Sequence, residues 1–330
     1  MPIVAAIALV LITAILSVAF PLATYTFTLA TFGLTHVLTE LHYVNNRFRQ
    51  RLDNNLCLQI SQLLLIIICL RSSHLLGLIS SWVSIPLELI CVVGLVALVI
   101  PVLIKKDWRL GILGSALCGI LTLGIFWSAT LTLLLFTILH NITPVGFIAE
   151  KLRGKQRNYA LLACVVVFIL IPLVIISGVP NQFLSAIGWL NLNASLFSVG
   201  ELDLHLGVFL PPQLHHQGIS GTTYNYAIAA FSAAVFLQSM HYAVVIGILP
   251  NWENTHKTRL TNSLFPWMVL FLSTLLFLYF SKSFINARSL YGIISAVHAW
   301  VEIPILLLAL AIPEETKITS QSISSQEFIN

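Results

Sequence analysis

Histidine and glutamate residues stand inside otherwise apolar stretches of this sequence, and two pairs share one spacing. His36 and Glu40 are four residues apart within THVLTELHY, and His298 and Glu302 are four apart within VHAWVE. Residues four apart lie on one face of an α-helix. A carboxylate one turn from a histidine can fix the imidazole tautomer for metal binding, or can bind the metal itself. Glu40 and Glu302 are therefore predicted to support a metal site or to be ligands in it.

Two further histidines occupy comparable positions in other apolar runs. His140 stands immediately before Asn141, and His241 lies within QSMHYAVVIG. Counted along each helix to the nearest polar connection, His36, His140 and His241 lie about 14 Å from one side of the membrane. His298 lies deeper, about 22 Å from the same side. We therefore predict a metal site built by four helices from His36, His140, His241 and His298. His42 is a weaker candidate, because it is rotated off the face that carries His36.

Each of these residues also has a simpler interpretation. A buried histidine can hydrogen-bond a backbone carbonyl, and a carboxylate near the end of a span can lie at the membrane interface. Ionisable groups inside a span are costly, however, which makes a functional role the default hypothesis. We expect Glu88 to face the interface. We also expect a solvated loop to carry Asp203, His205, His215 and His216.

The composition requires an apolar environment around most of the chain. The 330 residues are 58% hydrophobic and 8% charged, whereas soluble domains carry about 25% charged residues. The net charge of +4 comes from basic residues in short connections. In a membrane protein this distribution reports topology, and it does not indicate a nucleic-acid partner. The bilayer itself is the expected partner.

The apolar runs predict an all-α transmembrane bundle of about ten helices, with eight or nine as alternatives. We expect one membrane domain over residues 1–313. The stretch 110–142 is too long for one ordinary span and short for two, so we predict two helices there, with one long tilted helix as the alternative. The runs are 3–20, 22–44, 57–73, 84–104, 110–126, 127–142, 158–178, 222–249, 263–281 and 289–312.

Basic residues follow every second run, which predicts the orientation. The positive-inside rule places these connections, and both termini, in the cytoplasm. By the same parity, the connection 179–221 is a long non-cytoplasmic loop, in which 183–192 is amphipathic enough to lie on the membrane surface. Residues 314–330 form a polar tail that we expect to be disordered. The basic groups are Arg47, Arg49 and Arg51; Lys105, Lys106 and Arg109; Lys151, Arg153, Lys155 and Arg157; and Lys257 and Arg259.

Known catalytic motifs do not account for these histidines. The sequence has no H-E-x-x-H zinc motif, no G-x-S-x-G elbow, no P-loop and no histidine box of the desaturase type. Imidazole ligands suit iron, copper and zinc. The leading hypothesis is an integral membrane metalloenzyme in which a non-haem iron supports oxidation, cleavage or desaturation of a lipophilic small molecule that arrives from the bilayer.

Single histidines on separate helices, here His36, His140, His241 and His298, resemble the pattern of the Brp/Blh family of carotenoid-cleaving dioxygenases. Members of that family are polytopic membrane proteins that hold iron with four histidines. The resemblance implies that these four histidines are iron ligands and that the substrate is a carotenoid. Where the family has a proline–histidine–glycine signature in an early helix, this sequence has Thr35-His36-Val37.

Two other functions remain open from the sequence. A membrane b-type haem protein would use two of the histidines as axial ligands, with Trp127, Trp267 and Trp300 as candidates to contact the flat cofactor. A proton-coupled transporter would use the His–Glu pairs as a relay. Helices interrupted at prolines would favour the transporter, and the prolines in or near spans are Pro101, Pro172, Pro266 and Pro304.

Overall fold

Every regular element in the described part of the chain is a helix, which confirms the all-α class. The computed structural model describes residues 3–49, 52–200, 202–209, 221–252 and 264–311. The predictions for His215, His216 and the tail 314–330 fall outside these residues. The α-helices are α1 (Ile3–Ala19), α2 (Pro21–Phe48), α3 (Asn54–Leu75), α4 (Ser81–Lys106), α5 (Trp108–His140), α6 (Thr143–Lys151), α7 (Gly154–Val165), α8 (Ile171–Ile176), α9 (Val179–Ala186), α10 (Leu202–Leu206), α11 (Gly221–Gly247), α12 (Phe265–Lys282) and α13 (Phe284–Ala311). A π-turn, η2 (Val166–Leu170), joins α7 to α8, and short 3₁₀ turns are η3 (Gly207–Phe209) and η5 (Leu249–Trp252).

In the described residues all ten predicted apolar runs are largely helical, and seven helical segments are long and apolar enough to cross a membrane. These segments are Asn54–Leu75, Ser81–Lys106, Trp108–Lys151, Gly154–Ile176, Gly221–Trp252, Phe265–Lys282 and Phe284–Ala311. The helix α1 is apolar but shorter, with 17 residues. The helix α2 is long enough but is not among the seven, since His36, Glu40 and several hydroxyl side chains interrupt its apolar sequence. Seven such segments indicate a multi-pass membrane protein.

The predicted division of 110–142 is present as a sharp break inside α5. Ser128 has φ −161° and ψ 100°, which is an extended conformation. The chain folds back there, since a Cβ atom on Gly124 would lie 2.5 Å from Oγ1 of Thr132. In a continuous helix, residues eight apart are separated by about 12 Å of rise. The absence of a side chain at Gly124 lets the two arms of α5 approach each other.

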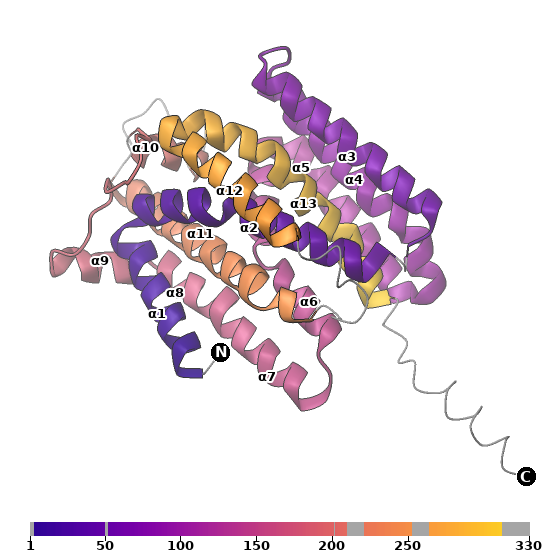
Figure 1. Cartoon of the computed structure of the whole chain (residues 1–330), viewed down its shortest axis with the longest axis horizontal. Helices are drawn as coiled ribbons and strands as arrows, with labels where there is room; N and C mark the ends of the chain where they lie inside the picture. The colour runs from indigo at the N-terminus through magenta and orange to yellow at the C-terminus, as the bar shows by residue number, and fades with distance from the viewer. Residues whose placement is uncertain (1–2, 50–51, 201, 210–220, 253–263, 312–330) are drawn as a thin grey trace, which may run out of the picture.

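The helices α2, α11 and α13 occupy the centre of the molecule (Figure 1). On one side α13 packs against α3 and α4, and α4 packs against α5. On the other side α11 packs against α1 and α8. The helix α12 lies against α2 and α13. The three central helices are segments far apart in the sequence, and their side chains meet in the interior.

The outer helices expose large apolar side chains, as expected for contact with lipid. Phe126 and Trp127 at the α5 break are 85% and 87% exposed, and Trp267 on α12 is 69% exposed. The buried part of the molecule is held by apolar packing around α4, α11 and α13, where Leu95, Phe236 and Trp300 are fully or nearly fully buried. This distribution is the reverse of an amphipathic soluble bundle, whose outer surface is polar.

The described part of the loop 179–221 is more structured than predicted, and one expectation about it was wrong. It contains α9, α10 and η3. His205 is not solvated but 3% exposed. Its Nε2 lies 3.1 Å from the Val199 carbonyl, and its ring contacts Tyr25 edge to face. Leu202, one turn before His205, and Leu206, the next residue, are both buried, so this short helix carries His205 into the interior with them.

Glu88 is also buried rather than facing the interface. Its carboxylate accepts hydrogen bonds from Nε and Nη2 of Arg71 on α3, at 3.0 and 2.7 Å, and from Nε1 of Trp300 on α13, at 2.7 Å. Arg71 also donates to the carbonyl of Gly292 at 2.6 Å. Glu88 therefore joins α3, α4 and α13. This pairing has no local signal in the sequence, because Arg71 and Glu88 stand on different helices.

Candidate metal centre

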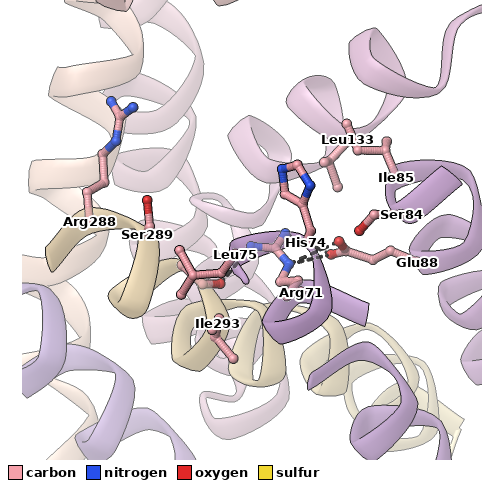
Figure 2. Close-up of a pocket in the computed structure, with 11 residues that line it drawn as sticks. Arg71, His74, Leu75, Ser84, Ile85, Glu88, Leu133, Arg288, Ser289 and Ile293 are labelled. Carbon is pink, nitrogen blue, oxygen red and sulfur yellow. Dashed lines mark hydrogen bonds and ion pairs between the residues drawn. The ribbon is translucent and has the colours of Figure 1, made fainter. Parts of the chain in front are cut away.

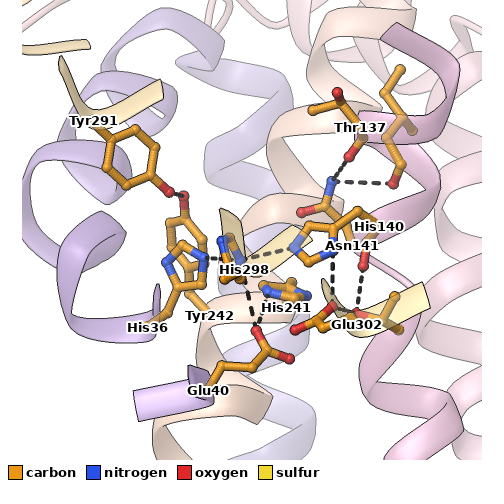
Figure 3. Close-up of polar contacts among 12 residues, drawn as sticks. His36, Glu40, Thr137, His140, Asn141, His241, Tyr242, Tyr291, His298 and Glu302 are labelled. Carbon is orange, nitrogen blue, oxygen red and sulfur yellow. Dashed lines mark hydrogen bonds and ion pairs between the residues drawn. The ribbon is translucent and has the colours of Figure 1, made fainter. Parts of the chain in front are cut away.

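Four helices bring the four predicted histidines together in the interior. His36 comes from α2, His140 from the end of α5, His241 from α11 and His298 from α13. Figure 3 shows the imidazole rings turned toward one another, with Glu40 and Glu302 beside them. His36, His241 and His298 are at most 2% exposed, and the His140 side chain is 9% exposed.

The Nε2 atom of His298 lies close to the Nε2 atoms of two other histidines. Nε2 of His298 lies 3.2 Å from Nε2 of His36 and 3.0 Å from Nε2 of His140. An Nε2 atom carries either a hydrogen or a lone pair, so it cannot donate one hydrogen bond and accept another. Nitrogen atoms whose lone pairs all point at one metal ion can lie this close without hydrogen-bonding each other. With metal–nitrogen bonds of about 2.1 Å, tetrahedral ligand nitrogens lie about 3.4 Å apart. The observed distances are close to that value.

The two carboxylates lie in the same space. Oε2 of Glu40 is 3.3 Å from Nε2 of His241 and 3.8 Å from Nε2 of His298. Oε2 of Glu302 is 3.0 Å from Nδ1 of His140. Both glutamates are 0% exposed. Two buried carboxylates are costly unless positive charge offsets them.

The ligand atoms form two overlapping groups, each compact enough for one ion. One group is His36, Glu40, His241 and His298, and the other is Glu40, His140, His298 and Glu302. Within each group the ligand atoms lie within 4.8 Å of one another. Both oxygens of Glu40, Oε1 of Glu302 and both ring nitrogens of His241 are buried without a hydrogen-bond partner. Buried polar atoms are rarely left unpaired, and a cation would satisfy these. The residues thus form a buried His/Glu group that can hold a metal ion.

Local chemistry explains why His140 reaches this space. Pro144 has no backbone N–H, so α5 cannot continue its hydrogen bonds past the His140 carbonyl. Thr143 Oγ1 instead lies 2.8 Å from that carbonyl, and the same atom is 2.7 Å from Oε2 of Glu302. Asn141 Nδ2 donates to the carbonyl of Ile138. The end of α5 is therefore fixed, and its last side chain points into the bundle.

Two contacts hold the segment after His140 against the central helices. Arg47 on α2 donates Nε and Nη2 to Oε2 of Glu150 on α6, at 2.9 and 2.7 Å. On the same short helix, a Cβ atom on Gly146 would lie 2.8 Å from Leu306 of α13. The glycine therefore permits a close approach of α6 to α13, the helix that carries His298 and Glu302.

Two tyrosines next to the centre were missed in the sequence. The Tyr242 ring stacks on His36 with centroids 4.0 Å apart, and its hydroxyl lies 3.3 Å from the hydroxyl of Tyr291. Both tyrosines are buried. Tyr242 directly follows His241 in the chain, but nothing in its sequence distinguishes it from an ordinary core aromatic residue. Only the packing of α2 against α11 places it on His36.

The weaker candidate, His42, lies apart from the cluster. It belongs to neither of the two groups that can hold an ion. Its Nε2 lies 2.9 Å from Nδ2 of Asn46, and its ring stacks on Phe265. The rotation of His42 off the His36 face, expected from the helical repeat, accounts for this difference.

Comparisons with known proteins found no relative of this chain. No family model, no curated protein sequence and no solved structure matches the chain. The functional interpretation therefore depends on the geometry of the buried His/Glu group.

Proposed function

We propose that the chain is an integral membrane metalloenzyme that uses one non-haem iron to oxidise, cleave or desaturate a lipophilic substrate. The observation that carries the proposal is that His298 and Glu40 belong to both His/Glu groups, with Nε2 of His298 3.2 Å from Nε2 of His36 and 3.0 Å from Nε2 of His140. In this proposal the basic connections and both termini face the cytoplasm.

The donor set suits iron, one of the metals that imidazole binds. Mixed histidine and carboxylate ligands with open positions are typical of non-haem iron oxygenases and of catalytic zinc sites, whereas structural zinc sites are closed and tetrahedral. Each of the two groups combines histidines with at least one glutamate. Iron bound there would supply oxygen activation. Glu302, 3.0 Å from Nδ1 of His140, would hold that ring in a fixed orientation.

The surroundings favour a lipophilic substrate. The centre is enclosed by apolar segments, and both of its glutamates are fully buried. A substrate dissolved in the bilayer would approach between helices. If the resemblance to carotenoid-cleaving dioxygenases holds, that substrate is a carotenoid.

The geometry is less favourable for haem. Neighbouring imidazoles pack at centroid distances of 4.7–5.2 Å, in edge-to-face or tilted arrangements. Axial haem ligands stand on opposite faces of a wide macrocycle, and the other two rings occupy the space that it would need. Of the three candidate tryptophans, Trp127 and Trp267 face outward.

A proton relay is the second candidate function. The contacts Glu40–His241 at 3.3 Å and Glu302–His140 at 3.0 Å are those a relay requires. Pro101 and Pro304, however, lie inside α4 and α13 without interrupting them, and Pro266 lies in the first turn of α12. Pro172 is the exception, because it follows the π-turn η2 between α7 and α8. The relay requires no bound metal, so metal content separates the two functions.

The deciding experiment is metal analysis with an absorption spectrum, on protein purified in mild detergent without chelators. We expect about one iron per chain and no Soret band. His298→Ala and His241→Ala should each abolish metal binding, whereas His42→Ala, on the same helix as His36, should retain it. Full metal content in both cluster variants would refute the proposal. A folded, metal-free wild type that moves protons in vesicles would replace it with the relay.

A further inference from the structure

A second site lies at one end of the bundle, away from the metal centre. A cavity of about 490 Å³ opens between α3, α4, α5 and α13. Figure 2 shows Arg288 and Ser289 on one side of it, and His74, Ile85 and Leu133 on the other, with the Arg71–Glu88 ion pair beside them. The cavity thus combines cationic and apolar walls.

The charges lining the cavity do not cancel. Arg71 and Glu88 neutralise each other through hydrogen bonds of 2.7–3.0 Å. Arg288 is half-buried, and among the described residues no carboxylate lies within ion-pair distance of it. One positive charge therefore remains. An unpaired guanidinium in a partly desolvated site favours an anionic ligand.

Arg288 is held in place by a neutral partner. Its Nη1 lies 3.2 Å from Nδ1 of His205, whose Nε2 is 3.1 Å from the Val199 carbonyl. Burial lowers the pKa of His205, and Arg288 lowers it further, in opposition to the hydrogen bond to Val199. At neutral pH the imidazole is therefore uncharged, donates Nε2–H to the carbonyl and accepts from Arg288 through Nδ1. This arrangement orients the guanidinium without neutralising it.

The position of the cavity along the helices suits an amphiphile. Leu75 is the last residue of α3, Ser84 lies in the first turn of α4, and Arg288 lies in the second turn of α13. If these segments cross a membrane, this end lies at the level of the lipid headgroups. Leu75, Ile85, Leu133 and Ile293 supply apolar wall beside the charge.

We propose that this cavity binds the anionic headgroup of an amphiphile, with its phosphate or carboxylate on Arg288 and its apolar chain along Ile85 and Leu133. A guanidinium forms paired, charge-assisted hydrogen bonds to such groups. The site is independent of the metal centre. The same anionic group can come from a bilayer lipid or from a soluble molecule, and the two sources are separable by experiment.

The test is a titration of the full chain in neutral detergent, followed by the shift of its thermal unfolding midpoint. The ligands are a short-chain phosphatidylglycerol, the matching phosphatidylcholine and inorganic phosphate. Phosphatidylglycerol should raise the midpoint and phosphatidylcholine should not. Arg288→Gln should weaken phosphatidylglycerol binding at least tenfold. Lys282→Gln removes the same charge at the exposed end of α12 and should leave binding unchanged.

Each outcome decides the proposal. Stabilisation by phosphatidylglycerol alone supports a lipid headgroup, and equal stabilisation by inorganic phosphate supports a soluble anion at the same guanidinium. Equal affinity in wild type and Arg288→Gln would overturn the proposal, as would equal binding of the zwitterionic lipid. If Arg288→Gln does not fold, Ser289→Phe, which fills the cavity without changing its charge, must weaken phosphatidylglycerol binding. Unchanged binding in that variant would also overturn the proposal.

Discussion

At the residue scale, the candidate centre consists of six ionisable side chains whose burial is costly unless they share a bound cation. Glu40 and Glu302 are fully buried, and several of their oxygens have no hydrogen-bond partner. Each imidazole beside them must lose its contact with water as well. A bound cation would satisfy these atoms at once, which is why the glutamates matter as much as the histidines.

Glu302→Gln should therefore weaken metal binding without unfolding the protein. The amide keeps the shape of the carboxylate but removes the charge 3.0 Å from Nδ1 of His140. Losing such a partner typically costs about 10- to 100-fold in metal affinity. Competition against a chelator of known affinity measures the change. Thr143→Val, which removes only the hydroxyl 2.7 Å from Glu302, should have a smaller effect in the same direction. Unaltered affinity in Glu302→Gln would exclude this role.

At the element scale, α5 decides where His140 lies. The break at Ser128 folds the two arms against each other, and the close contact of Gly124 with Thr132 is possible only without a side chain. A straight helix over residues 108–140 would be about 50 Å long, and its last residue could not reach the same depth as His36.

Gly124→Ala should consequently destabilise the protein by about 1–3 kcal/mol, the usual cost of overpacking. The new methyl group would lie 2.5 Å from Thr132 Oγ1. Gly119→Ala is the matched control on the same helix, because a Cβ atom there meets nothing within 4 Å; alanine should be neutral or stabilising at that position. Thermal unfolding followed by helical circular dichroism compares the two variants. Equal midpoints would show that the arms are not tightly packed.

At the scale of the whole molecule, the centre joins helices from both ends of the chain. The helices α2, α5, α11 and α13 each contribute at least one group to it. A ligand that binds only the folded state stabilises it by mass action, by about 2.7 kcal/mol at a concentration 100 times its dissociation constant. A metal held by four helices should therefore stabilise the entire bundle.

Removal of the metal should lower the unfolding midpoint of the wild-type protein, and re-addition of iron should restore it. The variant His298→Ala, which lacks the nitrogen shared by both groups, should have the lower midpoint from the outset and should not respond to the chelator. Differential scanning fluorimetry in detergent measures both effects. A chelator response of equal size in His298→Ala would place the stabilising ion elsewhere.

The sequence by itself determined the helical class, the apolar runs and the residues of the centre. Helical runs follow from local apolar length, and an ionisable side chain in such a run is conspicuous because its burial is costly. That His36 and Glu40 share one helix face, and His298 and Glu302 another, follows from the helical repeat alone. Even the break in 110–142 was expected from its length.

Tertiary structure alone decided the other contacts between helices. Pairings between helices have no signature in local sequence, because they depend on how helices pack in three dimensions. The stacking of Tyr242 on His36, the burial of His205 and the pairing of Arg71 with Glu88 are of this kind. The separation of His42 from the cluster, by contrast, follows from the helical repeat of α2, and tertiary structure decided only that its ring stacks on Phe265.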